Sequence, residues 1–560
     1  MKKNWLILII IFVGLLVVNF IASNFYIRFD LTEDKRYTLS EAAKNTLKDV
    51  DSPVFIEVFL KGEFPSEFVR LKAETRQILE EFKAENTNVV FEFIDPFENE
   101  ANPEEIKKQL FSLGIIPAQA QVRENGKTSQ VFVYPWALAY YNNKTVRIPL
   151  LKNQLGTTSE ERVNNSVQNL EYAFADGFNK LVSPKKRKVA VLKGNGELQD
   201  GELADFIKTL KEYYFTAAFT LDSAVTSPTK VIKQIKDFDL LVIAKPTEAF
   251  SDTEKYILDQ YTMNGGKSLW LIDAVTMDSD SLFNTGNTLA IPRDLRLTDF
   301  FFKYGIRINK NLVNDLYSAP IVLASGAGNN TQYEKYHWFY NPLSASTNSH
   351  PIVDNIEAVK FEYASDIDTL SNSIKKTVLL SSSKITKLVG TPSEIKLDYI
   401  NTFSAIVNEG PNPQEYASGE RPMAVLLEGT FTSVYNNRVK PFIYSEDKSE
   451  SVDTKMVVIS DGDVIKNQFQ GNRPLELGFD KWTNTFYGNK EFLLNTVNYL
   501  LDDTGLINIR SKEISVAFLD PQKTANERTK WQLLNVLVPL LLLGVFGFLF
   551  KYVRKRRFAQ

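Results

Sequence analysis

The chain of 560 residues has no cysteine and only two histidines, His337 and His350. The lack of cysteine excludes thiol nucleophiles, CxxC redox pairs, thiolate-bound zinc and iron–sulfur clusters. A serine triad or a histidine-ligated metal would need one of the two histidines, and neither lies in an HExxH motif or another ligand spacing. We therefore expect both histidines to be structural, and we expect no enzymatic activity, no metal and no cofactor.

Motifs of ATP-binding and nucleic-acid-binding proteins are also missing. The chain has no G-x-x-x-x-G-K-[ST] sequence and no ABC-type signature, so we do not expect it to be the ATPase of a transporter. Its net charge of −3 is unevenly distributed, because seven basic residues lie close to the ends, at 2–3 and 551–557. The rest of the chain has 58 basic and 68 acidic residues. An acidic body without a basic stripe argues against a nucleic acid as partner.

Two long uncharged runs lie near the ends of the chain. The first, WLILIIIFVGLLVVNFIA (Trp5–Ala22), has 18 residues, close to the ~20 that cross a bilayer as a helix. A cleaved signal peptide is the alternative, but its apolar region would be unusually long and no A-x-A-like site follows. A lipoprotein is excluded because there is no cysteine to acylate.

The second run, LLNVLVPLLLLGVFGFLF (Leu533–Phe550), has aromatic residues on both sides, Trp531 and Tyr552, which suit the membrane interface. A buried helix of a soluble domain is the alternative, but the KYVRKRR sequence that follows argues against it. Basic residues outside both runs predict that both termini are cytoplasmic. The body, from about residue 28 to 530, would then lie on the periplasmic side of the inner membrane.

The length of the chain predicts two to four domains. We expect an α/β protein with one transmembrane helix at each end. The expected parts are 1–29 with the first span at about 5–22, a thioredoxin-like α/β domain at 30–183, a parallel α/β domain at 184–345, an α+β portion at 346–527 that completes or packs on that domain, and 528–560 with the second span at about 533–550.

The first folded part has the order β-α-β-α-β-β. PVFIEVFL (53–60) predicts a buried strand and 66–85 an amphipathic helix; a second strand, a short helix ending near Gly114 and a hairpin around Asn142–Asn143 follow. This order is similar to the thioredoxin fold. Where that fold keeps its CxxC pair, the chain reads Lys61-Gly62-Glu63-Phe64, so a redox role is excluded and a scaffold or interaction domain remains.

A regular alternation of strands and helices follows the basic linker SPKKRK (183–188). It predicts a parallel sheet, whose crevice at the carboxyl ends of the strands is where such sheets bind ligands. The expected strands are near 188–193, 215–220, 239–244 and 268–272, and the expected helices are at 202–213, 229–236 and 252–263.

The first strand of this sheet leads into GNGE, residues Gly194, Asn195, Gly196 and Glu197. The stretch matches neither G-x-G-x-x-G nor a P-loop. Glycines before a helix could hold an anion, but Glu197 and Asp200 would repel it. Two interpretations stay open: a tight strand-to-helix turn, or a loop that binds a polar ligand or a partner at this edge. We name the four residues as the candidate binding site.

The second half of the chain is less regular. RLTDFFFKYGIRINKNLV predicts a helix and a strand, TVLLSSS, AVLLEGTFTSVY and KMVVISDGDVI predict further strands, and NKEFLLNTVNYLLDD predicts a helix. Stretches rich in Asn, Ser and Pro (324–351, 405–421, 441–453) are expected to be loops. Asp461 and Asp463 in SDGDV suggest Ca²⁺, but the loop lacks the spacing and distal Glu of an EF-hand, so a capping or turn role is the favoured alternative.

Several segments recur in a characteristic order: RFDLTEDKRYTLS, the strand followed by GNGE, HPIVDNIEAVKFEYASDID, VVISDGDVI and GNKEFLLNTVNYLLDD, between two apolar runs. Together they resemble the gliding-motility ABC-transporter auxiliary family GldG of Bacteroidota over essentially the whole chain. The resemblance implies a subunit that works with a polytopic permease and a cytoplasmic ATPase. It also implies a 184–345 domain similar to a ciliary-transport module and, more distantly, to class I glutamine-amidotransferase-like folds, whose nucleophilic cysteine is missing here. The turn in that family is commonly GHGE, and Asn195 replaces its histidine.

Three functions follow from these observations. The first is a non-catalytic, membrane-anchored auxiliary subunit of an ABC transporter associated with gliding motility, whose periplasmic domain binds a partner or the transported substrate. The second is a membrane-tethered hydrolase-like relic, which the lack of cysteine, histidine and G-x-S-x-G disfavours. The third is a structural scaffold of the cell envelope, which the sequence does not separate from the first.

Overall fold

The computed structural model describes residues 5, 12–15, 19, 38–62, 64–98, 102–124, 127–152, 157–326, 331–345, 348–502, 505–511 and 521–558. Two compact units divide the chain, Met1–Lys512 and Glu513–Gln560. Most of the span expected at 5–22 lies outside the described residues, so that expectation remains a prediction.

The first part of the larger unit is built on a mixed four-stranded sheet. Its strand order is β2-β1-β5-β6, with β1 parallel to β2 and antiparallel to β5. The elements of this part are α2 (Glu41–Asn45), β1 (Val54–Val58), α3 (Ser66–Glu85), β2 (Val89–Phe93), α4 (Pro103–Ser112), β3 (Ala118–Glu124), β4 (Lys127–Val133), β5 (Trp136–Tyr141), β6 (Lys144–Pro149) and α5 (Ser159–Val182).

Apolar periodicity explains how this sheet is covered. The inward-facing residues of α3 and α5 pack together on one face, with Phe82 against Phe178 at 5.0 Å between ring centroids. Leu110 of α4 joins a separate cluster with Phe59 and Leu138. The elements up to α4 and the final hairpin β5-β6 occur in the expected order, but the separate hairpin β3-β4 between them was not predicted. The thioredoxin likeness stays a prediction.

A seven-stranded sheet forms the centre of the second part. Its order is β19-β22-β23-β10-β9-β7-β8, parallel from β23 to β8, with β22 antiparallel to both β23 and β19. The strands and the helices that pack on them are β7 (Lys188–Lys193), α6 (Ala204–Tyr213), β8 (Phe215–Thr220), α7 (Pro228–Ile235), β9 (Leu240–Ala244), α8 (Asp252–Met263), β10 (Lys267–Leu271), α10 (Thr298–Tyr304), β19 (Lys375–Ser381), β22 (Pro422–Gly429), β23 (Thr454–Ile459) and α12 (Asn489–Leu501).

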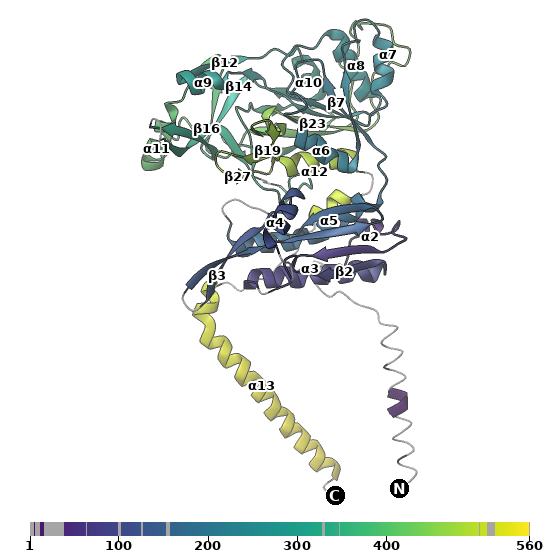
Figure 1. Ribbon diagram of the computed structural model, residues 1–560, viewed down its shortest axis with the longest axis vertical. Helices are drawn as coiled ribbons and strands as arrows, with labels where there is room; N and C mark the ends of the chain where they lie inside the picture. The colour runs from purple at the N-terminus through teal and green to yellow at the C-terminus, as the bar shows by residue number, and fades with distance from the viewer. Residues whose placement is uncertain are drawn as a thin grey trace. The chain divides into compact units, whose positions relative to one another are not determined.

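Both faces of the central parallel strands are buried, in keeping with their almost continuously apolar sequences, whereas the edge strand β8 is largely exposed. Val189 and Val191 of β7 point to a core shared with α6 and α12, whereas Ala190 and Leu192 point to a core shared with α7, α8 and α10. Figure 1 shows α6 and α12 on one side of β7 and β23, and α7, α8 and α10 on the other. The result is a three-layer α/β/α arrangement. Strands β19, β22 and β23 come from the 346–527 portion and complete the sheet.

Smaller sheets lie beside this core and pair segments that are distant in the sequence. Their order is β11-β12-β21, β15-β16-β17, β13-β18 and β14-β20, with short hairpins β24-β25 and β26-β27. The elements are β11 (Val275–Thr276), α9 (Ser279–Thr285), β12 (Asn287–Pro292), β13 (Ile306–Ile308), β14 (Asn311–Asp315), β15 (Ser318–Ser325), β16 (Gln332–Ser344), β17 (Val359–Lys360), β18 (Ile367–Thr369), β20 (Thr386–Gly390), β21 (Ser393–Lys396), α11 (Tyr399–Glu409), η2 (Asp463–Ile465), β24 (Phe469–Gln470), β25 (Arg473–Pro474), β26 (Phe479–Asp480), β27 (Thr485–Phe486) and η3 (Leu506–Ser511).

Two of the expected loops contain regular structure. Strand β16 runs through the stretch 324–351, and helix α11 extends into 405–421. The expectation of a loop was wrong for β16 because its aromatic residues at 336–340 favour a strand more strongly than its Asn and Pro oppose one. Trp338 and Tyr340 are buried in a core with Leu312 and Ile395.

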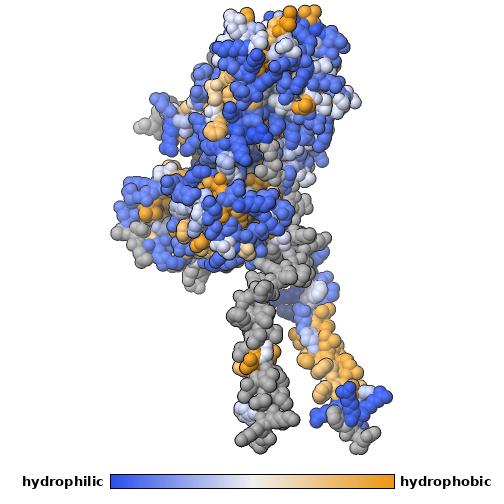
Figure 2. Space-filling view, turned by 90° about the vertical axis from the view of Figure 1, so that its right-hand side faces the viewer, coloured by the Kyte–Doolittle hydropathy of each residue, from blue (hydrophilic) through white to orange (hydrophobic). Residues whose placement is uncertain are grey.

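The smaller unit contains one long helix, α13 (Pro521–Phe558), with Pro539 inside it. Its segment Asn526–Arg557 is long and apolar enough to cross a membrane, which agrees with the second expected span. Figure 2 shows an apolar band along this helix and hydrophilic residues near its end. The leucines, valines and phenylalanines of 533–550 are exposed, which is unfavourable in water and suits a lipid environment.

Candidate functional site

The carboxyl edge of the seven-stranded sheet is the place where a parallel sheet offers a ligand crevice. Strand β7 is flanked by β8 and by β9, so the chain reverses its direction of travel across the sheet between β7 and β9. The crevice at such a switch point is the usual binding position. The predicted residues 194–197 lie here, directly after β7.

The GNGE residues form a tight turn. Gly194 and Gly196 have positive φ values of 115° and 71°, a region that side chains disfavour. The main-chain N–H groups of Thr247 and Glu248 both donate to the carbonyl oxygen of Asn195, at 2.9 Å each. These bonds join the loops after β7 and β9 and close the switch point. Helix α6 begins only at Ala204, so its N-terminus does not follow the turn directly.

The side chains of this turn point inward. Asn195 and Glu197 are 4 % and 5 % exposed, whereas Gly194 and Gly196 are exposed. Glu197 accepts a hydrogen bond from the N–H of Asn195 at 2.8 Å, while its Oε1 and the Oδ1 of Asn195 have no partner among the described residues. Burial raises the pKa of Glu197. The structure thus brings all four predicted residues together, and only the glycines present a surface. Whether they contact a partner stays a prediction.

A second group of polar residues lies at the same edge, after β9, β10 and β23. The carboxylates of Asp273, Asp461 and Asp463 have oxygen atoms within 4.8 Å of one another. The ammonium group of Lys245 contacts Asp463 and lies 3.2 Å from Asp273. Lys245 itself has a positive φ of 56°. We call these four residues the lysine–aspartate cluster.

Backbone hydrogen bonds hold the aspartates of this cluster. Asp461 accepts from the N–H groups of Glu362 and Asp463, at 2.6 and 2.7 Å, and Asp273 accepts from the N–H of Gly462 at 2.6 Å. The geometry agrees with the turn role favoured for Asp461, whereas the carboxylate of Asp463 is paired with Lys245. A Cβ on Gly462 would lie 2.4 Å from Cγ of Lys245, so only glycine lets the lysine reach the carboxylates.

The single positive charge of Lys245 offsets only part of the negative charge of the three aspartates. Burial acts to lower the pKa of Lys245, but the charges of Asp463 and Asp273 outweigh it and the pKa is raised. Burial, and then the charges of Asp463 and Asp273, raise the pKa of Asp461. The lysine ammonium pairs with two of the three carboxylates, Asp273 and Asp463, whereas Asp461 is held by backbone N–H groups. The cluster therefore serves as an ion-paired support of the sheet edge.

Lys245 and Asp273 were not predicted as site residues from the sequence. Each follows a buried strand that ends at this edge, as Asp461 does, and this shared position was the available signal. The histidines lie elsewhere: His337 donates from Nδ1 to the carbonyl oxygen of Ser318 at 3.1 Å and stacks on Phe403, and the ring of His350 packs on Tyr499.

Comparisons with known proteins find matches over most of the chain. Residues 186–496 match a family described as "ABC-type uncharacterized transport system", and residues 33–140 match a "Domain of unknown function (DUF7088)". A protein of Borreliella burgdorferi, described as "Uncharacterized protein", is 23 % identical over 541 residues, which are 95 % of this chain and 94 % of that one.

A solved structure, "mmIFT52 N-terminal domain", covers 56 % of this chain and 97 % of its own with 13 % identity and a TM-score of 0.31, a likeness too low to carry an argument. The family match, in contrast, spans more than half of the chain and includes every strand of the seven-stranded sheet. The chain therefore belongs to the family of auxiliary components of ABC-type transport systems.

Proposed function

We propose that the protein is a non-catalytic, membrane-anchored accessory subunit of an ABC transport system. The observation that carries the proposal is the family match over residues 186–496, in a chain whose other unit is an apolar helix long enough to cross a bilayer. An accessory subunit needs a permanent position beside a permease, and a membrane helix provides one. The partners we propose are a polytopic permease and a cytoplasmic ATPase.

The proposed position is the inner membrane, with both termini in the cytoplasm and the large unit in the periplasm. The basic residues after α13 support a cytoplasmic C-terminus. The association with gliding motility rests on the order of the segments that resemble GldG, from RFDLTEDKRYTLS to GNKEFLLNTVNYLLDD.

The sheet edge supports a role without catalysis. Two backbone hydrogen bonds to Asn195 close the switch point, and Lys245 of the lysine–aspartate cluster is paired with Asp273 and Asp463. The pKa of Lys245 is raised by its aspartate partners, so its amine stays protonated and does not act as a nucleophile. We further propose that the exposed turn at Gly194 and Gly196 contacts a partner subunit.

The test is purification of the tagged full-length protein from its native membrane in mild detergent, followed by identification of co-eluting proteins. We expect a permease and an ATPase in constant ratio to the protein, and an unrelated tagged single-span protein serves as the control. Recovery of the protein with neither of them would contradict the proposal and would favour an envelope scaffold.

The turn is tested in the same preparation with the double variant Asn195→Ala, Glu197→Ala. We expect the variant to fold and to reach the membrane. Less permease should co-elute with it, because the loss of the two buried side chains alters the conformation of the exposed turn. Unchanged recovery would reduce the four residues to a structural turn.

A further inference from the structure

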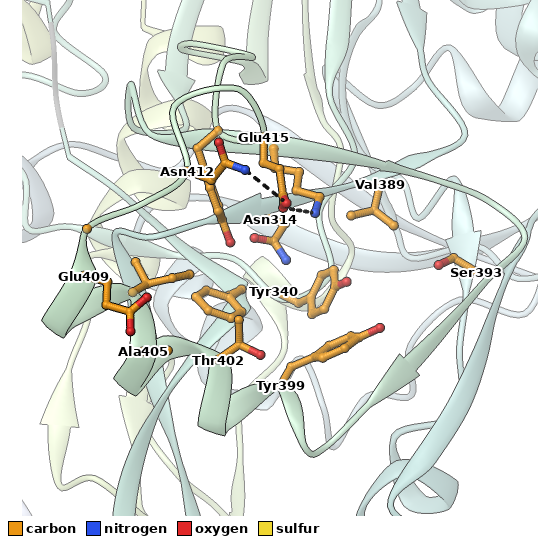
Figure 3. A pocket seen from close by; sticks show the side chains of 15 residues that line it. Asn314, Tyr340, Val389, Ser393, Tyr399, Thr402, Ala405, Glu409, Asn412 and Glu415 are labelled. Atoms are coloured by element: carbon orange, nitrogen blue, oxygen red, sulfur yellow. Dashed lines mark hydrogen bonds and ion pairs between the residues drawn. The ribbon is translucent and has the colours of Figure 1, made fainter.

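A cleft lies away from the carboxyl edge of the sheet, between β14, β16, β20 and α11. Its volume is about 390 Å³, within the range of pockets that hold small molecules. Figure 3 shows side chains from these elements converging on the space. The GNGE turn and the lysine–aspartate cluster do not line it.

Asn314 is the polar side chain at the base of this cleft. It is 6 % exposed, and its Oδ1 has no hydrogen-bond partner among the described residues. Strand β14 fixes its position, because Asn314 pairs with Lys387 of β20 in the antiparallel register. An unpaired buried carbonyl costs about 1–3 kcal/mol. Oδ1 itself has almost no accessible surface, so a ligand that donates to it must displace a neighbouring side chain of the wall, and the hydrogen bond then removes this cost.

Aromatic rings form much of the wall. Tyr340 and Tyr399 lie below Asn314 in Figure 3, and Phe339 and Tyr416 also line the cleft. Burial raises the pKa of Tyr340 and of Tyr416 to about 12 each. Both hydroxyls are therefore neutral at physiological pH and can donate or accept hydrogen bonds.

The charges of the lining disfavour an anion. Lys387 and Glu415 form an ion pair at 2.8 Å, and Asn412 donates to the same carboxylate. Glu409 adds a second carboxylate, so the lining has one more negative than positive charge. A phosphate or carboxylate ligand would meet an occupied lysine and an additional acid.

We propose that this cleft binds a neutral sugar, as a monosaccharide or a disaccharide. A sugar ring has an apolar C–H face that packs on tyrosine, and hydroxyl groups that donate to Asn314 Oδ1 and to the carboxylates. A purely apolar ligand would leave Asn314 unpaired, and a quaternary ammonium ion has no hydrogen to donate to it. The proposal goes beyond the accessory role, because a sugar site in the isolated protein does not depend on a permease.

Isothermal titration calorimetry on the full-length protein in detergent tests the proposal. The probes are glucose, galactose, N-acetylglucosamine, maltose and cellobiose, with choline and phosphate as the competing chemistries. We expect at least one sugar to bind with a Kd below ~1 mM, and neither choline nor phosphate to bind.

Two variants locate the binding. Asn314→Leu should weaken sugar binding at least ~10-fold, because it removes the acceptor. The variant also removes the amide that hydrogen-bonds the Tyr340 hydroxyl, so its melting temperature is measured beside the affinity. Tyr399→Ala, at a half-buried position on α11, should also weaken binding. The matched control is Tyr333→Ala, which is 68 % exposed and outside the cleft.

Three results would overturn the proposal: no binding of any of these sugars up to ~10 mM, binding of choline or phosphate in their place, or sugar binding that both cleft variants leave unchanged. If Asn314→Leu does not fold, Tyr399→Ala decides the question. None of these results bears on co-purification with a permease, so a failure here is distinguishable from a failure of the accessory role.

Discussion

At the scale of single residues, the turn after β7 depends on glycine for two separate reasons. Gly196 has a φ of 71°, and a Cβ on it would lie 2.1 Å from Oγ1 of Thr247. Gly419 has a similar φ of 67° but open space around it, so it isolates the cost of the backbone conformation. We expect Gly419→Ala to cost about 1 kcal/mol from backbone strain, and Gly196→Ala to cost about 2–3 kcal/mol more from overpacking.

Urea unfolding of both variants measures the difference in the free energy of unfolding. Equal losses would show that the side chain of Thr247 moves aside, and that the close approach of the two loops is not rigid.

The lysine–aspartate cluster gives a second prediction at this scale. Lys245→Met removes the one ammonium group among three carboxylates, and its side chain is only 19 % exposed. Breaking such a pair costs about 3–5 kcal/mol. The control, Lys375→Met, removes an ion pair with Glu428 from a side chain that is 72 % exposed, for which about 0–1 kcal/mol is typical.

Thermal unfolding with and without Ca²⁺ adds a direct readout. In the Lys245→Met variant a divalent cation can take the place of the ammonium, so we expect Ca²⁺ to raise its melting temperature and to leave the wild type unchanged. A loss no larger than that of Lys375→Met would show that the cluster does not support the sheet edge.

His350 contributes a pH dependence. Burial lowers its pKa in the folded state below the ordinary value of 6.5. The unfolded chain therefore binds more protons in this range, and the stabilising contribution of neutral His350 is complete above about pH 6.5 and is lost as the pH falls through the lower, folded pKa. We expect His350→Gln to lose less stability than the wild type between pH 7.5 and pH 5.

The measurement is the melting temperature of both proteins across this pH range. Parallel curves for variant and wild type would show that the burial of His350 does not contribute to the acid sensitivity.

At the scale of elements, α8 is fixed to the segment after β22 by one buried carboxylate. Asp259 is fully buried and accepts hydrogen bonds from the hydroxyls of Tyr304 and Ser433, at 2.9 and 2.6 Å, and from the N–H of Val434 at 2.8 Å. Asp259→Ala leaves these three donors unpaired in the core. We expect a loss of about 3–5 kcal/mol, since each unpaired donor costs about 1–3 kcal/mol and the effects overlap.

Chemical unfolding measures this loss, and Asp237→Ala, at an exposed position after α7, is the control with a change below about 0.5 kcal/mol. A small loss for Asp259→Ala would mean that water enters and replaces the carboxylate.

The elements that the sequence predicts well are those whose pattern is local. The strands expected at 188–193 and 215–220 are β7 and β8 with the same bounds, and the helix expected at 252–263 is α8. Continuous apolar runs and capping residues such as Ser251 carry that information within a few residues. Such local patterns do not specify which distant segments pair. The pairing of β12 with β21 and of β14 with β20 was therefore not predicted.

The same contrast between local patterns and distant pairing decides which site residues could be predicted from the sequence. The GNGE turn lies in one short stretch and was visible in the sequence. Lys245, Asp273 and Asp461 come together only because three strands end at one edge, and Asn314 and Tyr399 line one cleft only because β14 and α11 both lie beside β16. Such constellations depend on sheet order, which the sequence pattern does not specify.

At the scale of the whole molecule, the decisive question is on which side of the membrane the large unit lies. The segment Asn526–Arg557 can span a bilayer, and its end carries Lys555, Arg556 and Arg557, which favours a cytoplasmic C-terminus. The first expected span at 5–22, with Lys2 and Lys3 before it, predicts a cytoplasmic N-terminus as well.

Protease added to spheroplasts should then degrade the body and leave both ends intact. Epitope tags at the two ends and an antibody against the body follow this cleavage, and a cytoplasmic marker protein confirms that the membrane is closed. Protection of the body would place it in the cytoplasm and contradict the proposed topology, because a domain between two cytoplasmic ends and two spans can lie only on the far side.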